Sequence, residues 1–113
     1  MLKVIFEDKD NKLTLKLDGH AGQATIGHDI VCASCSILAY TVAQLVKVAE
    51  AQGDLLNAPE IKLENGDAII SCEPIDEARS GLYAAYMFAA TGYNLLAHNY
   101  PQYVDLKSFG KAE

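Results

Sequence analysis

The chain has 113 residues, half of them hydrophobic, and carries a formal charge of −6 at pH 7. This length fits one domain over residues 1–113, with a buried core and no separate regulatory module. It contains nine lysines and arginines, which form no run, and this argues against direct binding to nucleic acid. The most apolar stretch, residues 37–49, is too short and too often interrupted by polar residues to cross a membrane.

Cysteine content and the start of the chain bear on the cellular compartment. The sequence begins directly in a strand-like alternation and shows no secretory signal. Three cysteines, an odd number, fit a reducing compartment better than a framework of disulfides. We therefore expect a soluble, cytoplasmic protein.

Two strands are predicted at the beginning of the chain. In residues 12–18 leucine alternates with polar side chains, which is the period of a strand with one buried face. Residues 2–7 provide its partner, with a polar turn between them. Gly19 ends the second strand, so His20 is expected at the rim of the sheet. It begins a glycine-containing loop over residues 20–28.

A long helix is predicted over about residues 30–52, which contain neither proline nor glycine. Asp29 is a candidate for its N-cap, because a carboxylate there accepts hydrogen bonds from the backbone N–H groups of the first turn. Cys32 then lies in that first turn, where the aligned peptide dipoles favour ionisation of a thiol. The apolar face of this helix is broad, which suggests burial on two sides. It comprises Leu38, Val42, Leu45 and Val48 or Ala49, with Ile37 and Val46 widening it.

The second half of the chain repeats the order strand, strand, helix. Residues 61–63 and 68–72 flank Asn65-Gly66, which is a strong signal for a two-residue hairpin turn. A second helix follows over about residues 76–98, and the tail after it can add an edge strand. Together these elements predict an α+β fold. We expect a small mixed or antiparallel sheet from two hairpins, in the order β-β-α-β-β-α plus a C-terminal tail, with both helices on one face.

His20 and Cys32 form the most informative pair of side chains. A thiolate is a strong nucleophile near neutral pH when a nearby imidazole or a helix N-terminus favours its ionisation. An imidazole and a thiol on either side of a glycine-containing loop therefore indicate a cysteine nucleophile with a histidine base. His28 is a competing base, and Asp29 can orient a histidine as well as cap the helix. Ser36 lies one helical turn after the cysteine, on the same face.

The spaced pattern Gly-His-Ala, then Gly-x-Asp-Ile-Val-Cys-Ala-x-x-Ser, resembles that of the ribosomal-processing cysteine proteases, the Prp family. The resemblance implies that His20 and Cys32 are the catalytic pair, supported by Gly19, Asp29 and Ser36. It also implies a short single domain with two helices and a small sheet. The family and the broad first helix together point to a homodimer, and we expect neither a cofactor nor a metal ion.

The implied substrate is a large-subunit ribosomal protein, number twenty-seven in that subunit's series. The enzyme would remove its short N-terminal extension by cleaving after an aromatic residue. Ribosomal proteins are usually basic, and the acidic charge of this chain suits a basic partner. One departure from the family is Cys35, at a position where a small or aliphatic residue is more usual.

Two other classes of function stay open at the level of sequence. Cys32 and Cys35 form a Cys-x-x-Cys at a helix start, as in thiol-disulfide oxidoreductases. Against this, the strand, helix, strand order of a thioredoxin-like unit is absent before the motif, and the Gly-His-Ala pattern would have no role. The other class is a catalytically inactive module that binds a ribosomal protein. A zinc site is disfavoured because a second closely spaced pair of ligands is lacking.

The remaining cysteine and the tyrosines fit the core better than a binding site. Cys72 lies in a strand of alternating apolar residues. Five tyrosines could line a groove for an extended peptide, but core or interface positions are more common for such residues. They are Tyr83, Tyr86, Tyr93, Tyr100 and Tyr103.

Overall fold

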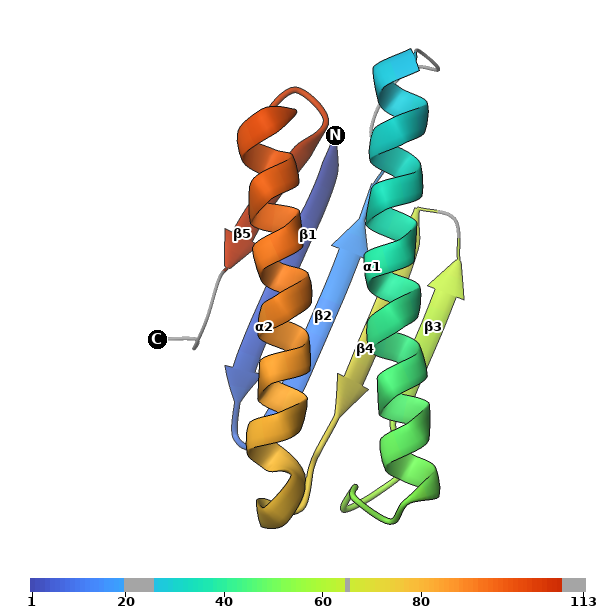
Figure 1. Ribbon diagram of the computed structural model, residues 1–113, viewed down its shortest axis with the longest axis vertical. Coiled ribbons are helices and arrows are strands. Elements are labelled where there is room, and N and C mark those ends of the chain that lie inside the picture. The colour runs from blue at the N-terminus through green and yellow to red at the C-terminus, as the bar shows by residue number, and fades with distance from the viewer. Residues whose placement is uncertain (20–25, 65, 109–113) are drawn as a thin grey trace.

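A five-stranded sheet and two helices make up the fold, shown as a computed structural model in Figure 1. The structure describes residues 1–19, 26–64 and 66–108, with the backbone alone for residues 26–29 and 108. In chain order the elements are β1 (Leu2–Lys9), β2 (Lys12–Asp18), α1 (Ile26–Ala51), β3 (Glu60–Glu64), β4 (Asp67–Cys72), α2 (Asp76–Asn99) and β5 (Val104–Ser108). This order confirms the predicted α+β fold, and the tail does add an edge strand.

The first hairpin sets where β2 ends. Its turn residues Asp10 and Asn11 have φ angles of 53° and 63°, as the mirror-image turn that suits a two-residue hairpin requires. Aspartate and asparagine tolerate this left-handed region better than other side chains. The strands pair antiparallel, from Lys9 opposite Lys12 to Lys3 opposite Asp18. The end of β2 therefore lies beside the beginning of β1.

The second hairpin joins the first through its later strand. The strand order is β3-β4-β2-β1-β5, with β5 parallel to β1, so the sheet is mixed. Asp18 pairs with Asp67, and the Gly19 N–H donates a 3.0 Å hydrogen bond to the carbonyl of Gly66. The end of β2 and the turn of the second hairpin are therefore neighbours.

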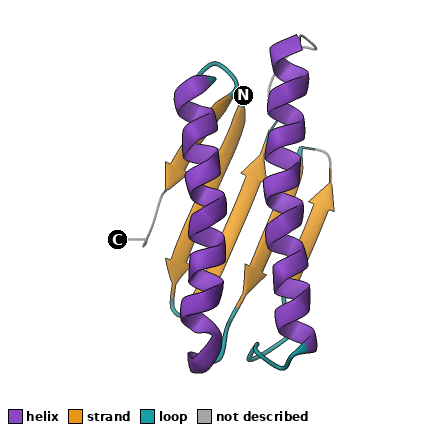
Figure 2. Cartoon of the chain, in the orientation of Figure 1, coloured by secondary structure: helices purple, strands orange, loops and turns teal. Residues whose placement is uncertain are grey.

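Both helices cover the same face of the sheet, as Figure 2 shows and as the sequence predicts. Alternate strand residues point to opposite faces of a sheet, and on the covered face Val4, Phe6, Leu15 and Ile70 are fully buried. Lys16, on the opposite face, is exposed. The core therefore lies between the sheet and the helix pair.

α1 begins at Ile26, earlier than the sequence indicates. Gly27 thus lies in the helix rather than in the preceding loop. One glycine in a helix costs only about 1 kcal/mol, and the packing of a long amphipathic helix offsets such a cost. The prediction that Asp29 is the N-cap is wrong, because Asp29 is inside the helix. Cys32 lies in the second turn, beyond the first turn to which the effect of the helix dipole is largely confined.

The buried stripe of α1 also differs from the predicted one. Its buried side chains are mostly small: Val31, Cys35, Ala39, Val42, Ala43, Val46 and Ala49. Ile37, Leu45 and Val48, which the sequence places on the buried face, are 61%, 44% and 41% exposed. The reason is that α1 packs against β4 and α2 through its small residues, which leaves a third, apolar side at the surface.

One stretch of the described chain, Ile30–Ala51 within α1, is long and apolar enough to cross a membrane by those two criteria. A helix in the core of a globular protein has the same length and composition. In this fold α1 contacts α2 and β4. About a third of the stretch is buried in the fold, and other apolar side chains of α1, such as Ile37, lie at the surface.

Buried tyrosines and an ion pair hold α2 in place. The hydroxyl of Tyr86 donates a 3.0 Å hydrogen bond to the carbonyl of Ile70 in β4, and that of Tyr93 donates a 2.8 Å bond to the carbonyl of Cys35 in α1. Both tyrosines are fully buried, which confirms their expected place in the core. Near the start of α2, Nη2 of Arg79 lies 2.5 Å from Oδ1 of Asp8, whose side chain is 4% exposed.

Candidate active site

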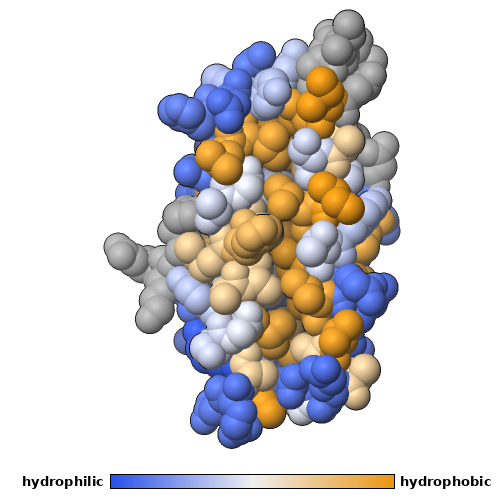
Figure 3. Space-filling view, viewed as in Figure 1, coloured by the Kyte–Doolittle hydropathy of each residue, from blue (hydrophilic) through white to orange (hydrophobic). Residues whose placement is uncertain are grey.

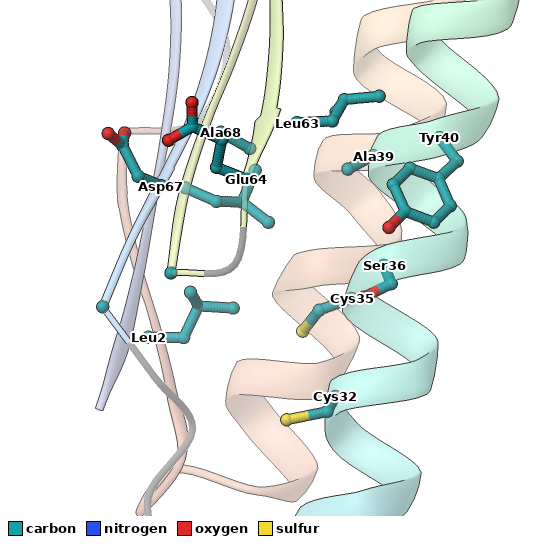
Figure 4. A pocket seen from close by; sticks show the side chains of 13 residues that line it. Leu2, Cys32, Cys35, Ser36, Ala39, Tyr40, Leu63, Glu64, Asp67 and Ala68 are labelled. Atoms are coloured by element: carbon teal, nitrogen blue, oxygen red, sulfur yellow. The ribbon is translucent and has the colours of Figure 1, made fainter.

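A cavity of about 340 Å³ lies between the first half of α1 and the end of the sheet where β2 meets the second hairpin. Cys32, Ser36 and Tyr40 line it from α1, and Leu63 and Asp67 from the hairpin (Figure 4). Its size is within the range of ligand-binding cavities in proteins. It has room for one or two side chains of a peptide.

Cys32 and Ser36 meet at this cavity, one helical turn apart, as their spacing predicts. Cys32 is half-buried, and in Figure 4 its sulfur points to the side of α1 that faces the sheet. Cys72, in contrast, is 2% exposed in the core, as expected. A half-buried thiol on a cavity wall can be reached by a peptide carbonyl, whereas a sealed core thiol cannot.

Gly19 lines the same cavity at the end of β2. Its φ of +102° lies in the region that favours glycine, and a Cβ here would be 2.6 Å from the carbonyl oxygen of Met1. His20 follows it in the chain but lies outside the described residues, as do the side chains of His28 and Asp29. The imidazole–thiol pair and the orienting role of Asp29 therefore stay predictions.

The position of Cys32 inside α1 limits the donors that could stabilise an oxyanion. In an α-helix only the first four N–H groups lack a partner within the helix, and in α1 these belong to residues 26–29. The backbone N–H of Cys32 comes after them and is used by the helix. Donors for an oxyanion must therefore come from other groups around the cavity.

Cys35 also lines the cavity but has a different environment. It is 3% exposed, and burial, with a smaller contribution from the neighbouring Cys32, raises the pKa of its thiol from an ordinary 9.0 to about 12. This thiol stays protonated at neutral pH and is a poor nucleophile. The oxidoreductase alternative is weakened because it needs Cys32 at the start of the helix, and α1 begins earlier, at Ile26.

The wall formed by the second hairpin is not anticipated by sequence reasoning. Glu64, Asp67 and Ala68 contribute to it. Nζ of Lys62 lies 2.6 Å from Oδ2 of Asp67, and this ion pair holds the pKa of the carboxyl below its usual value. The sequence signal that could have indicated this wall is the Asn65-Gly66 turn, which predicts the second hairpin. Its place beside α1, however, depends on the pairing of β4 with β2, which has no local signature in the sequence.

Among the side chains that the structure describes, those of residues 1–19, 30–64 and 66–107, no three histidines, cysteines, aspartates or glutamates gather in a way that could hold a metal ion. The described cavity instead offers a thiol, a hydroxyl one turn away and carboxylates at its rim. A thiol so placed can attack a carbonyl and form an acyl intermediate. These groups are compatible with a cysteine-dependent peptidase.

Comparison with known proteins identifies the family. The family model described as "Cysteine protease Prp" matches residues 1–105. The chain therefore belongs to the Prp family of cysteine proteases, as its Gly-His-Ala and Cys-Ala-x-x-Ser patterns indicate. A search of curated proteins found no match.

Solved structures share the fold across nearly the whole chain. SMU.848 from Streptococcus mutans has a TM-score of 0.69 and 23% identity, covering 99% of this chain and 96% of that one. The essential ribosomal processing protease Prp from S. aureus, in complex with a covalently linked product peptide, has a TM-score of 0.67 and 20% identity, covering 96% of this chain and 99% of its own. The same protease with a substrate peptide gives 0.67 and 19% at the same coverage.

Proposed function

We propose that this protein is an endopeptidase that removes the short N-terminal extension of large-subunit ribosomal protein twenty-seven by cleaving after an aromatic residue. The observation that carries the proposal is the half-buried Cys32 on the cavity wall, in a chain of the cysteine protease Prp family. The S. aureus relative, a ribosomal processing protease with bound peptides, supports the substrate class. We further propose a cytoplasmic location, where thiols stay reduced.

In the proposed reaction the Cys32 thiolate attacks the carbonyl carbon that follows the aromatic side chain. His20 takes the thiol proton and later gives it to the leaving amine, so that the peptide bond breaks and an acyl-enzyme remains. Water then attacks the thioester and releases the extension. Because Asp29 does not cap the helix, its proposed role is to orient His20, while Gly19 and Ser36 shape the site around the pair.

The rim of the cavity supports a basic substrate. Glu64 and Asp67 both line it; Lys62 lowers the pKa of the Asp67 carboxyl and offsets its charge, so Glu64 carries the local negative charge. Carboxylates at the mouth of a site attract positively charged peptides and increase the rate of encounter. This local charge has the same sign as the −6 of the whole chain.

The proposal is tested with a synthetic peptide that carries the extension and its aromatic residue. Cys32→Ala and His20→Ala should each abolish cleavage without changing the far-ultraviolet circular dichroism, because each removes one member of the reacting pair. Cys72→Ala is the matched control, since it removes a core thiol away from the cavity and should still cleave. Full activity in Cys32→Ala would end the proposal.

The same assay separates the alternatives. Cys35→Ala should still cleave the peptide if the protein is a protease, whereas a thiol-disulfide oxidoreductase would lose its activity with that cysteine. An inactive binding module would bind the peptide, as seen by isothermal titration, and leave it intact. Cleavage by the wild type rejects the binding module.

We also propose that the protein is a homodimer formed through the outer face of its helices. A groove of about 560 Å³ between α1 and α2 is lined by Ile37, Leu45, Phe88 and other residues without a charged side chain. Phe88 is 77% exposed, and Figure 3 shows an apolar surface along this face. Two copies of a chain with charge −6 repel each other, so an uncharged apolar face is where they can approach most closely.

Light scattering after size-exclusion chromatography tests the dimer. The wild type should have twice the mass of the chain, and Phe88→Glu should shift it to the monomer because it buries a charge at the interface. Leu56→Glu is the control, since Leu56 is 59% exposed and does not line the groove. A monomeric wild type at micromolar concentration would reject this part of the proposal.

A further inference from the structure

Two cysteines lie one turn apart on the same side of α1. Cys32 and Cys35 both line the cavity, and Figure 4 shows both sulfur atoms on the side of α1 that faces the sheet. Residues three apart in an α-helix have Cα atoms about 5 Å apart, which is within the range of roughly 4.4–6.8 Å that disulfides span. A bond between the two is therefore within reach of the backbone.

The Cβ separation in a regular α-helix is close to the one that a disulfide requires but somewhat larger. Residues one turn apart on a helix have Cβ atoms about 5–6 Å apart, whereas a disulfide holds them at about 3.5–4.5 Å. The turn of α1 between Cys32 and Cys35 must tighten to form the bond. A disulfide under such tension is easily reduced again.

We propose that Cys32 and Cys35 are a reversible, peroxide-sensitive modification site, in which a disulfide switches the protease off and shields its nucleophile from irreversible oxidation. The proposal rests on the proposed role of Cys32 as the nucleophile. It assigns Cys35 a function that proteolysis itself does not need.

The chemistry balances with hydrogen peroxide as oxidant and an external thiol as reductant. The Cys32 thiolate attacks one peroxide oxygen, an S–O bond forms, the O–O bond breaks, and the second oxygen leaves as hydroxide. The Cys35 sulfur then attacks the Cys32 sulfur, the S–O bond breaks, and the departing oxygen takes the Cys35 proton to leave as water. Two external thiols later reduce the disulfide in two exchange steps and become a disulfide themselves.

The environments of the two thiols fix the order of these steps. Burial keeps Cys35 protonated at neutral pH, with a pKa of about 12, so it does not react with peroxide first. Cys32 is the more exposed of the two and meets the oxidant. The third thiol is too distant to compete, because Cys72 lies four residues along β4 from Ala68 at the cavity wall, which is about 13 Å in a strand.

The experiment compares the wild type with Cys35→Ala, Cys35→Val and Cys72→Ala. Each protein is treated with hydrogen peroxide and then with dithiothreitol, and its peptide cleavage is compared with its own untreated rate. Peptide mapping by mass spectrometry follows the thiols in parallel. Cys35→Val keeps more of the buried volume, so the comparison survives if Cys35→Ala folds poorly.

For the wild type we expect loss of cleavage, a Cys32–Cys35 crosslink, and recovery by dithiothreitol to within about twofold of the starting rate. The free thiols titrated after unfolding should fall from three to one. Cys72→Ala should show the same loss, crosslink and recovery, with its free thiols falling from two to none. In both Cys35 variants, the activity recovered with dithiothreitol should be at least about tenfold lower than in the wild type. Cys32 should carry two added oxygens, because thiols do not reduce sulfinic acid.

Two results would overturn the proposal: no Cys32–Cys35 crosslink in the oxidised wild type, or equal recovery with and without Cys35. Failure of the protease function itself is seen separately, because the reduced wild type would then not cleave the peptide at all. The crosslink is measured by mass and does not depend on cleavage.

Discussion

Gly19 shows how strongly the site depends on one backbone conformation. Replacing it with alanine puts a Cβ 2.6 Å from the Met1 carbonyl oxygen, at a φ of +102° that alanine rarely adopts. We expect Gly19→Ala to lower the free energy of unfolding by about 2 kcal/mol. It should also reduce kcat/KM about a hundredfold, because the chain leading into His20 is displaced. Urea unfolding and peptide cleavage measure the two effects.

Gly53→Ala is the matched control for this residue. Gly53 also has a positive φ, +77°, but a Cβ there meets nothing within 4 Å, and it lies at the other end of α1. This variant should lose about 1 kcal/mol and keep its kcat/KM. Equal effects of the two substitutions on cleavage would show that Gly19 has only a general structural role.

Among the elements, the link between β1 and α2 through Asp8 and Arg79 is the most sensitive to substitution. Oδ1 of Asp8 is paired with Arg79, while its Oδ2 is buried without a hydrogen-bond partner among the described residues. Arg79→Met leaves a buried carboxylate without its cation, and this should cost about 3 kcal/mol. Urea unfolding at neutral pH measures the loss.

Two further variants test whether the loss in Arg79→Met comes from the buried ion pair itself. Adding Asp8→Leu to Arg79→Met should recover much of the lost stability, because removing both charges removes the desolvation penalty. Lys107→Met breaks the pair between Lys107 and Asp105, which are 53% and 39% exposed, and should change stability little. An unchanged unfolding midpoint in Arg79→Met would contradict the assigned role of the ion pair.

The elements also show what sequence patterns can and cannot predict. Both hairpins and both helices were predictable, since strict alternation and the Asn65-Gly66 turn are local signals. The start of α1 was not, because one glycine costs only about 1 kcal/mol in a helix, so Gly27 does not fix where the helix begins. The Cys32 side of the cavity could be read from the motif, but its hairpin wall depends on the long-range pairing of β4 with β2.

For the whole molecule, the buried titratable groups predict weakness at alkaline pH. Burial raises the pKa of Cys35, Cys72, Tyr86 and Tyr93 above their ordinary values of 9.0 for cysteine and 10.0 for tyrosine. In the unfolded chain these groups lose their protons at the ordinary values, while in the fold they keep them. Their contribution to stability is therefore complete below about pH 9 and declines as the pH rises further.

The free energy of unfolding should thus fall steadily above about pH 9, and Cys35→Ala should soften this fall because it removes one of the four groups. Urea titrations followed by circular dichroism, from neutral pH upward, provide the measurement. A stability that stays constant or increases through this range would show that the buried thiols and phenols do not remain protonated.

The parallel pairing of β5 with β1 has a consequence for how the protein is made. Val104 pairs with Leu2, and the Leu2 N–H donates a 2.8 Å hydrogen bond to the carbonyl of Tyr103, so strands from opposite ends of the sequence close one sheet. During synthesis the edge of β1 that pairs with β5 has no partner strand until residues 104–108 leave the ribosome. Leu2 also lines the cavity beside Cys32, so the hydrogen bonds that hold this part of the cavity wall on the β5 side form only after residues 104–108 have been synthesised.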